Sequence, residues 1–320
     1  MSWRVLKFGG TSVGSPAALL AARDIVRAAA AESRVVVVVS ALAGVTSGIE
    51  ELLAAALARD PSWRDGFRAL RERHRRQLAA VAGGRAAVPA ADALDGGIER
   101  LRDLLRAVEL LGEVSPRTRA WVLAAGERLS TPIFAAALTC GGVAAVAVDG
   151  TEVLAAVGPH DDALPDVAAS RPKVADRLAT LGDAVAVVTG FFGGDDAGEV
   201  RLFGRGGSDT SATALAAALA AERVEIWTDV DGVATADPRL DPAARWLPRL
   251  SYDAVEALAL AGARVLHWKA VAPARAAGVP IVVRNTFRPG AAGTWIGAEA
   301  ALPGRAAAPA GGIGGPPLLC

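Results

Sequence analysis

The sequence predicts an α/β fold, in which strands of a largely parallel sheet alternate with helices. The chain opens with the pattern of a strand, a helix and a second strand, and strand and helix patterns alternate again after about residue 127. The composition, 52% apolar but only 5% aromatic, suits small side chains packed between helices and a sheet. With 320 residues, the chain can form one large core or two lobes of ordinary domain size.

The opening unit is defined by two apolar runs and one helix start. Trp3–Phe8 predicts a strand, and Arg34–Ser40 predicts a second strand that is buried. Between them, Ser15 followed by Pro16 is typical of an N-cap and a first helical turn, so a helix is expected over Pro16–Glu32. A strand, a helix and a strand in this order indicate parallel pairing.

The segment from Ile49 to Leu111 is helical in pattern and richer in charge. Turn signals within it are Asp60-Pro61, Gly83-Gly84 and Gly96-Gly97. We expect residues 49–111 to form a helical excursion from the sheet, serving as a lid or an interface.

Strand and helix signals alternate beyond this excursion. The expected helices are Glu127–Leu138, Pro172–Leu181, Asp209–Ala221, Asp253–Ala261 and Leu266–Ala277. The expected strands are Val143–Val148, Ala184–Thr189, Val224–Thr228, Ile281–Arg284 and Thr294–Ile296. Residues 193–198 have turn chemistry and should join Phe191-Phe192 to Val200–Phe203 as a hairpin. The Ala, Gly and Pro-rich segment 298–320 is expected to be a disordered tail.

Composition disfavours several classes of function. Lys plus Arg and Asp plus Glu number 34 each, so no net charge draws the chain to nucleic acid or to a membrane. The N-terminus lacks the apolar core of a signal peptide and no apolar run could span a bilayer, so we expect a cytoplasmic protein. Cys140 and Cys320 form no C-x-x-C pair, and three scattered histidines predict neither a zinc site nor a nucleophilic triad.

Two glycine-rich loops about two hundred residues apart carry the chemical signal. Lys7-Phe8-Gly9-Gly10-Thr11-Ser12 ends the first strand, and Gly204-Arg205-Gly206-Gly207-Ser208-Asp209 opens an alanine-rich helix. Glycines let backbone N–H groups approach anionic oxygens, a helix N-terminus adds partial positive charge, and Lys7 and Arg205 can neutralise the remaining charge. The two loops therefore predict a phosphate cradle and phosphoryl transfer.

Beyond these two loops, the chain carries an ordered series of motifs. They are Lys7 to Val13, Val39-Ser40-Ala41 with Thr46, Gly126-Glu127, Gly190-Phe191, Gly204 to Asp209, Trp227 to Val230, Thr235 to Arg239, Val265-Leu266-His267 and Arg284 to Phe287. Taken in this order, the motifs resemble the catalytic domain of aspartate kinases, within the amino acid kinase superfamily. The match covers roughly residues 3 to 297, and the order of the motifs makes it specific.

The resemblance implies a three-layer α/β/α sandwich with a largely parallel central sheet. It implies a domain over 1–297, with an amino-acid-binding lobe over 1–195 and a nucleotide-binding lobe over 196–297. The expected reaction is transfer of the γ-phosphoryl group of ATP, with Mg²⁺, to the side-chain carboxylate of L-aspartate. A carboxylate is already ionised at pH 7, so this acceptor needs no general base.

The resemblance also assigns roles to individual residues. Lys7 and Asp209 are implied to be catalytic, and Arg205 to clamp the substrate α-carboxylate with its guanidinium fork. The residues implied to bind the amino acid are Ser40, Thr46, Glu127, Phe191, Arg205 and Ser208. Those implied to bind the nucleotide are Lys7, Gly9, Gly10, Thr228, Asp229, Asp237, Arg239 and Arg264.

Some of these residues also have a purely structural interpretation. Glu127 is expected to head a helix, and Ser208 and Asp209 suit the start of another, where caps and carboxylates are stabilising without any ligand. Ser40 and Thr46 can cap a helix, and Phe191 can belong to the core.

The chain departs from the family pattern on the ATP side and after Gly297. Ala234 stands where a tyrosine is common, Arg264 where a lysine is common, and Trp268 where proline is usual. Most aspartate kinases continue into ACT-type regulatory domains, whereas the Ala, Gly and Pro-rich segment after Gly297 is too short to fold into one. We therefore expect no feedback inhibition by lysine or threonine within this chain. A kinase for another amino-acid carboxylate and a non-catalytic binding homologue remain as alternatives, and pairing into a homodimer through the catalytic domain stays open.

Overall fold

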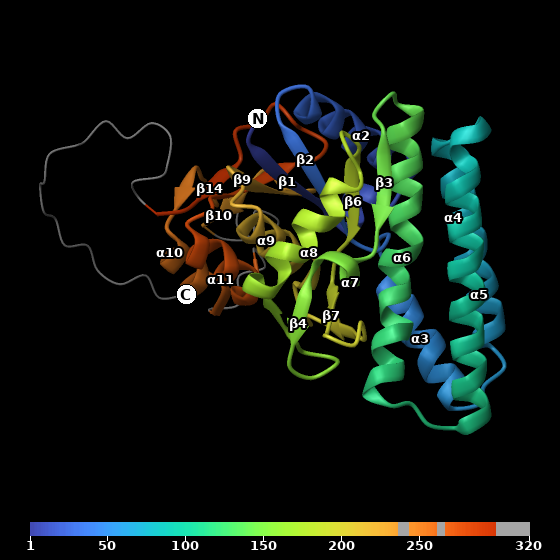
Figure 1. Cartoon of the computed structure of the whole chain (residues 1–320). Helices are drawn as coiled ribbons and strands as arrows, with labels where there is room; N and C mark the ends of the chain where they lie inside the picture. The colour runs from blue at the N-terminus through green and yellow to red at the C-terminus, as the bar shows by residue number, and fades with distance from the viewer. Residues whose placement is uncertain (236–242, 261–265, 299–320) are drawn as a thin grey trace, which may run out of the picture.

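The computed structural model describes residues 1–235, 243–260 and 266–298. An eight-stranded sheet forms its centre (Figure 1). From edge to edge its strands are β12 (Arg249–Leu250), β14 (Thr294–Ile296), β13 (Ile281–Asn285), β9 (Arg223–Thr228), β1 (Trp3–Phe8), β2 (Arg34–Val39), β6 (Val185–Thr189) and β3 (Ala145–Val148). Neighbouring strands are parallel except β13 and β14, which are antiparallel.

Helices follow most of these strands, and their bounds are as follows. They are α1 (Gly10–Val13), α2 (Pro16–Ala30), α3 (Val45–Leu57), α4 (Trp63–Val81), η1 (Gly84–Ala87), α5 (Val88–Leu111), α6 (Pro116–Cys140), α7 (Gly150–Val153), α8 (Val167–Ala179), α9 (Gly207–Ala218), α10 (Tyr252–Leu260) and α11 (Trp268–Ala277). Within the described ranges, none of them is long and apolar enough to cross a membrane.

The central sheet is covered on both faces, because successive side chains of a strand point to opposite sides. Leu6 and Phe8 of β1 belong to a core shared with α2, α3 and α6. Val5, the residue before Leu6, belongs to the opposite core, shared with α8, α9 and α11. Helices α4 and α5 lie outside α6 as the predicted excursion (Figure 1). The α/β class and the largely parallel sheet are confirmed, with helices as the two outer layers.

Two smaller sheets were not expected from the sequence. One contains, in order, β5 (Leu164–Asp166), β4 (Ala155–Val157), β7 (Phe192–Gly194) and β8 (Val200–Leu202). Its β7–β8 pair is the predicted hairpin around residues 193–198. The other pairs β10 (Val233–Ala234) with β11 (Trp246–Leu247).

Three local predictions are wrong. Glu127 does not head a helix but lies inside α6, which begins eleven residues earlier at Pro116 with Ser115 as its cap. Gly96 and Gly97 do not end a helix: α5 continues through them, and a Cβ at Gly97 would lie 3.0 Å from Leu129 of α6. Glycine therefore allows close packing of α5 on α6. Helix α8 starts at Val167, capped by Asp166, so Pro172 lies inside it.

Candidate active site

A cavity of about 390 Å³ opens at the carboxyl ends of the parallel strands. Strand β1 has β2 on one side and β9 on the other, so the strand order reverses there, and in open α/β sheets ligands bind at such a point. Eight predicted site residues line the cavity: Lys7, Gly10, Ser40, Thr46, Glu127, Phe191, Ser208 and Asp209. It is also lined by Ala41, Leu42, Ala43, Gly44, Ser47, Gly204, Gly206 and Gly207.

The two glycine loops meet at one end of this cavity. Lys7 of β1 is only 8% exposed, and its Nζ lies 2.6 Å from Oδ1 of Asp209 in the first turn of α9. Gly206 precedes α9 in a left-handed conformation, and no side chain caps this helix. The amide of Gly207 donates to the carbonyl oxygen of Gly204 at 3.0 Å. No side chain caps the amides of Ser208 and Asp209 that follow in the first turn, which suits an anionic ligand.

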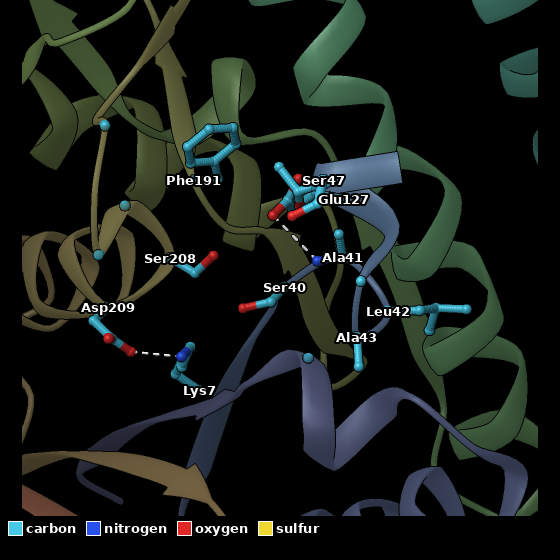
Figure 2. A pocket seen from close by; sticks show the side chains of 16 residues that line it. Lys7, Ser40, Ala41, Leu42, Ala43, Ser47, Glu127, Phe191, Ser208 and Asp209 are labelled. Carbon is cyan, nitrogen blue, oxygen red and sulfur yellow. Dashed lines mark hydrogen bonds and ion pairs between the residues drawn. The ribbon is translucent and has the colours of Figure 1, made fainter. Parts of the chain in front are cut away.

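Glu127 lies at the other end, and the hydroxyl groups of Ser40 and Ser208 lie between it and the Lys7–Asp209 pair (Figure 2). Its Oε1 accepts a hydrogen bond of 3.1 Å from the amide of Ala41. Its Oε2 is buried and has no hydrogen-bond partner among the described residues. Burial raises the pKa of Glu127 to about 8, an effect that the Ala41 amide and the charge of Lys7 only partly offset. This carboxyl group can therefore receive a further donor.

Two further features shape the cavity walls. The hydroxyl of Ser130 on α6 donates to the carbonyl oxygen of Ser40 at 2.7 Å, which ties the loop after β2 to the helix that carries Glu127. Phe191 has a left-handed φ of 77°, rare for a residue with a Cβ, and its carbonyl oxygen accepts from the Phe203 amide at 2.9 Å. A Cβ at Gly207 would lie 2.7 Å from the Phe191 ring, so the hairpin packs directly on the start of α9.

Four predicted residues lie outside the cavity lining. The amide of Gly9 donates to the carbonyl of Trp227 at 3.1 Å, which places the first glycine loop beside the end of β9. Thr228 and the exposed Asp229 follow there, linked by a 3.1 Å hydrogen bond between their side chains. Arg205 is exposed, on the loop between two lining glycines. Asp237, Arg239 and Arg264 lie outside the described residues.

The cavity carries less positive charge than the sequence suggested. Lys7 is the one cation that lines it within the described part of the chain, and Asp209 already pairs with it. Ser47 and the backbone from Ala41 to Gly44 also line the cavity, although they are not among the predicted site residues. The amide of Ala41 acts through its main chain, so its residue type gives no signal, whereas Ser47 offered a polar side chain close to the predicted Thr46.

A magnesium ion bound together with a nucleotide would fit the side chains of the cavity. Among residues 1–235, 243–260 and 266–298, no three His, Cys, Asp or Glu side chains gather as a metal cage. Mg²⁺ commonly binds through one or two carboxylates together with substrate phosphates and water. Asp209 is the cavity carboxylate beside the glycine loops and fits that pattern.

The fold and this cavity define the class of the protein. The chain belongs to the amino acid kinase family, whose model matches residues 2–285. Its relatives include aspartokinases: the bifunctional aspartokinase/homoserine dehydrogenase of Haemophilus influenzae is 33% identical over 300 residues, which are 92% of this chain and 36% of that protein. Aspartokinase 1, chloroplastic, of Arabidopsis thaliana is 35% identical over 306 residues, 91% of this chain and 51% of that protein.

A solved structure gives the same relationship. Aspartokinase III of E. coli, in complex with aspartate and ADP, is similar with a TM-score of 0.83 and 33% identity, over 92% of this chain and 64% of that one. The chain therefore spans between about one third and two thirds of the length of these relatives.

Proposed function

We propose that this chain is an aspartate kinase, which transfers the γ-phosphoryl group of ATP to the side-chain carboxylate of L-aspartate. The observation that carries the proposal is the meeting of both glycine loops in one cavity, with Lys7 and Asp209 2.6 Å apart and Glu127 facing them. The similarity to aspartokinase III, whose structure holds aspartate and ADP, supports the same choice of substrates.

The proposed reaction moves one phosphoryl group and no proton. A carboxylate oxygen of aspartate forms a bond to the γ-phosphorus, and the bond from that phosphorus to the β,γ-bridging oxygen breaks, giving 4-phospho-L-aspartate and ADP. Catalysis then depends on positioning and charge stabilisation rather than on a protein nucleophile. Lys7 neutralises charge on the transferring group, and Asp209 holds the Lys7 ammonium in place.

The remaining residues divide between the two substrates. Glu127 receives the α-ammonium group of aspartate, and Arg205 its α-carboxylate, while Ser40, Thr46, Phe191 and Ser208 enclose the amino acid. Gly9, Gly10, Thr228, Asp229, Asp237, Arg239 and Arg264 serve the nucleotide. Mg²⁺, which Asp209 would help to hold, would supply charge neutralisation at the phosphates of ATP. A cytoplasmic location and a homodimer stay predictions.

Trapping of the product tests the proposal. The protein is incubated with ATP, Mg²⁺, hydroxylamine and a panel of amino acids, and an acyl phosphate is captured as its hydroxamate. Hydroxamate formation with aspartate, and its loss in Lys7→Ala and Asp209→Ala with folding intact, is the expected result. Arg275→Met, on α11, is a matched control because Arg275 pairs with Asp253 and Glu256 on α10, neither of which lines the cavity.

Other results of this experiment would show which part of the proposal is wrong. ADP release that depends on another amino acid, without aspartate hydroxamate, would assign a different acceptor. ATP binding without turnover by any acceptor would make the chain a binding homologue. Near-normal rates in Lys7→Ala would overturn its catalytic role.

A further inference from the structure

An ion pair between a buried lysine and an exposed aspartate joins two distant segments beside the second glycine loop. Lys269, in the first turn of α11, contacts Asp162 in the loop between β4 and β5 through its Nζ and Asp162 Oδ1. Lys269 is 7% exposed, whereas the side chain of Asp162 is 64% exposed. An ammonium group this buried needs an opposite charge, and Asp162 is the acidic residue that contacts it among the described residues.

The choice of lysine at this position is informative. Among its 34 lysines and arginines, the sequence contains only three lysines, Lys7, Lys173 and Lys269. Lys7 and Lys269 are both buried. An ammonium is compact, whereas a guanidinium fork is planar and broad, so lysine and arginine are not interchangeable in a buried contact of this kind.

Asp162 and His267, which lies two residues before Lys269, both lie against the 204–207 loop, which consists of Gly204, Arg205, Gly206 and Gly207. A Cβ at Gly204 would lie 2.5 Å from Asp162 Oδ1, and a Cβ at Gly206 would lie 2.6 Å from the Cβ of His267, which precedes α11. Both glycines have positive φ values of 71°. The loop is therefore enclosed between the β4–β5 loop and the start of α11.

Arg205 lies within this same electrostatic environment. The pKa of His267 is lowered by burial and by the charges of Lys269 and Arg205, with Asp162 acting in the opposite direction. Arg205 and Lys269 thus place two positive charges near His267, and Asp162 is the carboxylate that balances them. Loss of Asp162 would remove that balance close to the loop.

We propose that Asp162 and Lys269 are positioning residues, whose ion pair holds the 204–207 loop so that Arg205 and Asp209 are presented to the substrates. This inference rests on the proposed function for its kinetic consequence. The pair itself makes no contact with the reacting atoms in this scheme, and neither residue lines the cavity.

The test compares Asp162→Asn, Lys269→Met and the double variant with Arg275→Met, which removes an ion pair elsewhere on α11. We expect each single variant to raise the KM for the amino acid about ten-fold through misplacement of the loop, with the KM for ATP changed by less than about two-fold. The double variant should be no worse than the single ones, because both remove the same interaction. Asp162→Glu, which keeps the charge, should recover most of the affinity.

Amide hydrogen exchange across residues 204–210 provides a readout that does not require turnover. Exchange should be faster in Asp162→Asn and Lys269→Met than in the wild type or Arg275→Met. Unchanged exchange, or equal effects on both substrates in every variant, would overturn the positioning role. A wild type that forms no hydroxamate would instead contradict the proposed function, and the exchange comparison would still decide whether the ion pair holds the loop.

Discussion

The protonation of Glu127 should make amino acid affinity depend on pH. Its carboxyl group is buried, its pKa is raised to about 8, and one oxygen has no partner among the described residues. An incoming α-ammonium group requires the ionised form. Binding should therefore be weak where Glu127 is protonated and should strengthen as the pH rises through 8.

The size of the effect follows from the pKa. With a pKa of about 8, roughly one tenth of the free protein has ionised Glu127 at pH 7 and roughly three quarters at pH 8.5. The apparent affinity for aspartate scales with that fraction, so it should rise about eight-fold over this interval. At pH 7, each binding event should release about 0.9 proton.

Titration calorimetry in buffers of different ionisation enthalpy measures both quantities. Glu127→Gln keeps an oxygen that can accept from the Ala41 amide but cannot ionise, so it should bind more weakly, without proton release and without this pH dependence. Glu50→Gln is a control, because Glu50 is an exposed glutamate paired with Arg119. Affinity that is flat between pH 7 and 8.5, with no proton released by the wild type, would refute the reasoning.

Three further predictions concern the same chain. Asp209→Asn removes the anion that holds Lys7, so hydroxamate formation should fall by about a hundred-fold or more; a smaller loss would argue against the pair. Gly206→Ala places a Cβ against His267 at a positive φ, so thermal unfolding should show a loss of at least about 1–2 kcal/mol, and an unchanged Tm would contradict the described loop. Burial lowers the pKa of His74 to about 4, so the folded state binds its proton less readily than the unfolded chain and stability falls as the pH drops below about 6.5. The loss should be about 2 kcal/mol between pH 6.5 and 5, and it should be absent in His74→Leu when both proteins are melted at the two pH values.

The sequence predicted the order of the main elements because periodicity is a local property. The opening unit and the Val224–Thr228 strand appear close to their expected bounds, as does the hairpin before the second glycine loop. The start of α6 was also available, since Ser115 and Pro116 repeat the pattern of Ser15 and Pro16 that was used for α2. Because this start was missed, Glu127 was predicted at the beginning of a helix, whereas it lies inside α6. It lines the cavity from there.

Other features depended on contacts that no local pattern contains. Gly97 suggested a turn, but its small size serves the contact between α5 and Leu129 of α6. The strands β4 and β5 are three residues each, and they are ordered by pairing with each other and by the pairing of β4 with β7. The ion pair between Lys269 and Asp162 joins residues 107 positions apart, and neither residue belongs to the two glycine-rich loops.

The backbone conformation of Phe191 limits how the cavity can be redesigned to accept another carboxylate. Its left-handed conformation costs roughly 1 kcal/mol for a residue with a Cβ and suits glycine or asparagine best. Exchanging this ring for valine or isoleucine, which are β-branched, would therefore disturb the chain path as well as the wall, and such variants should be less stable than the wild type. Thr46 and Ser47, which line the same cavity from the first turn of α3, are better positions at which to accommodate a longer carboxylate.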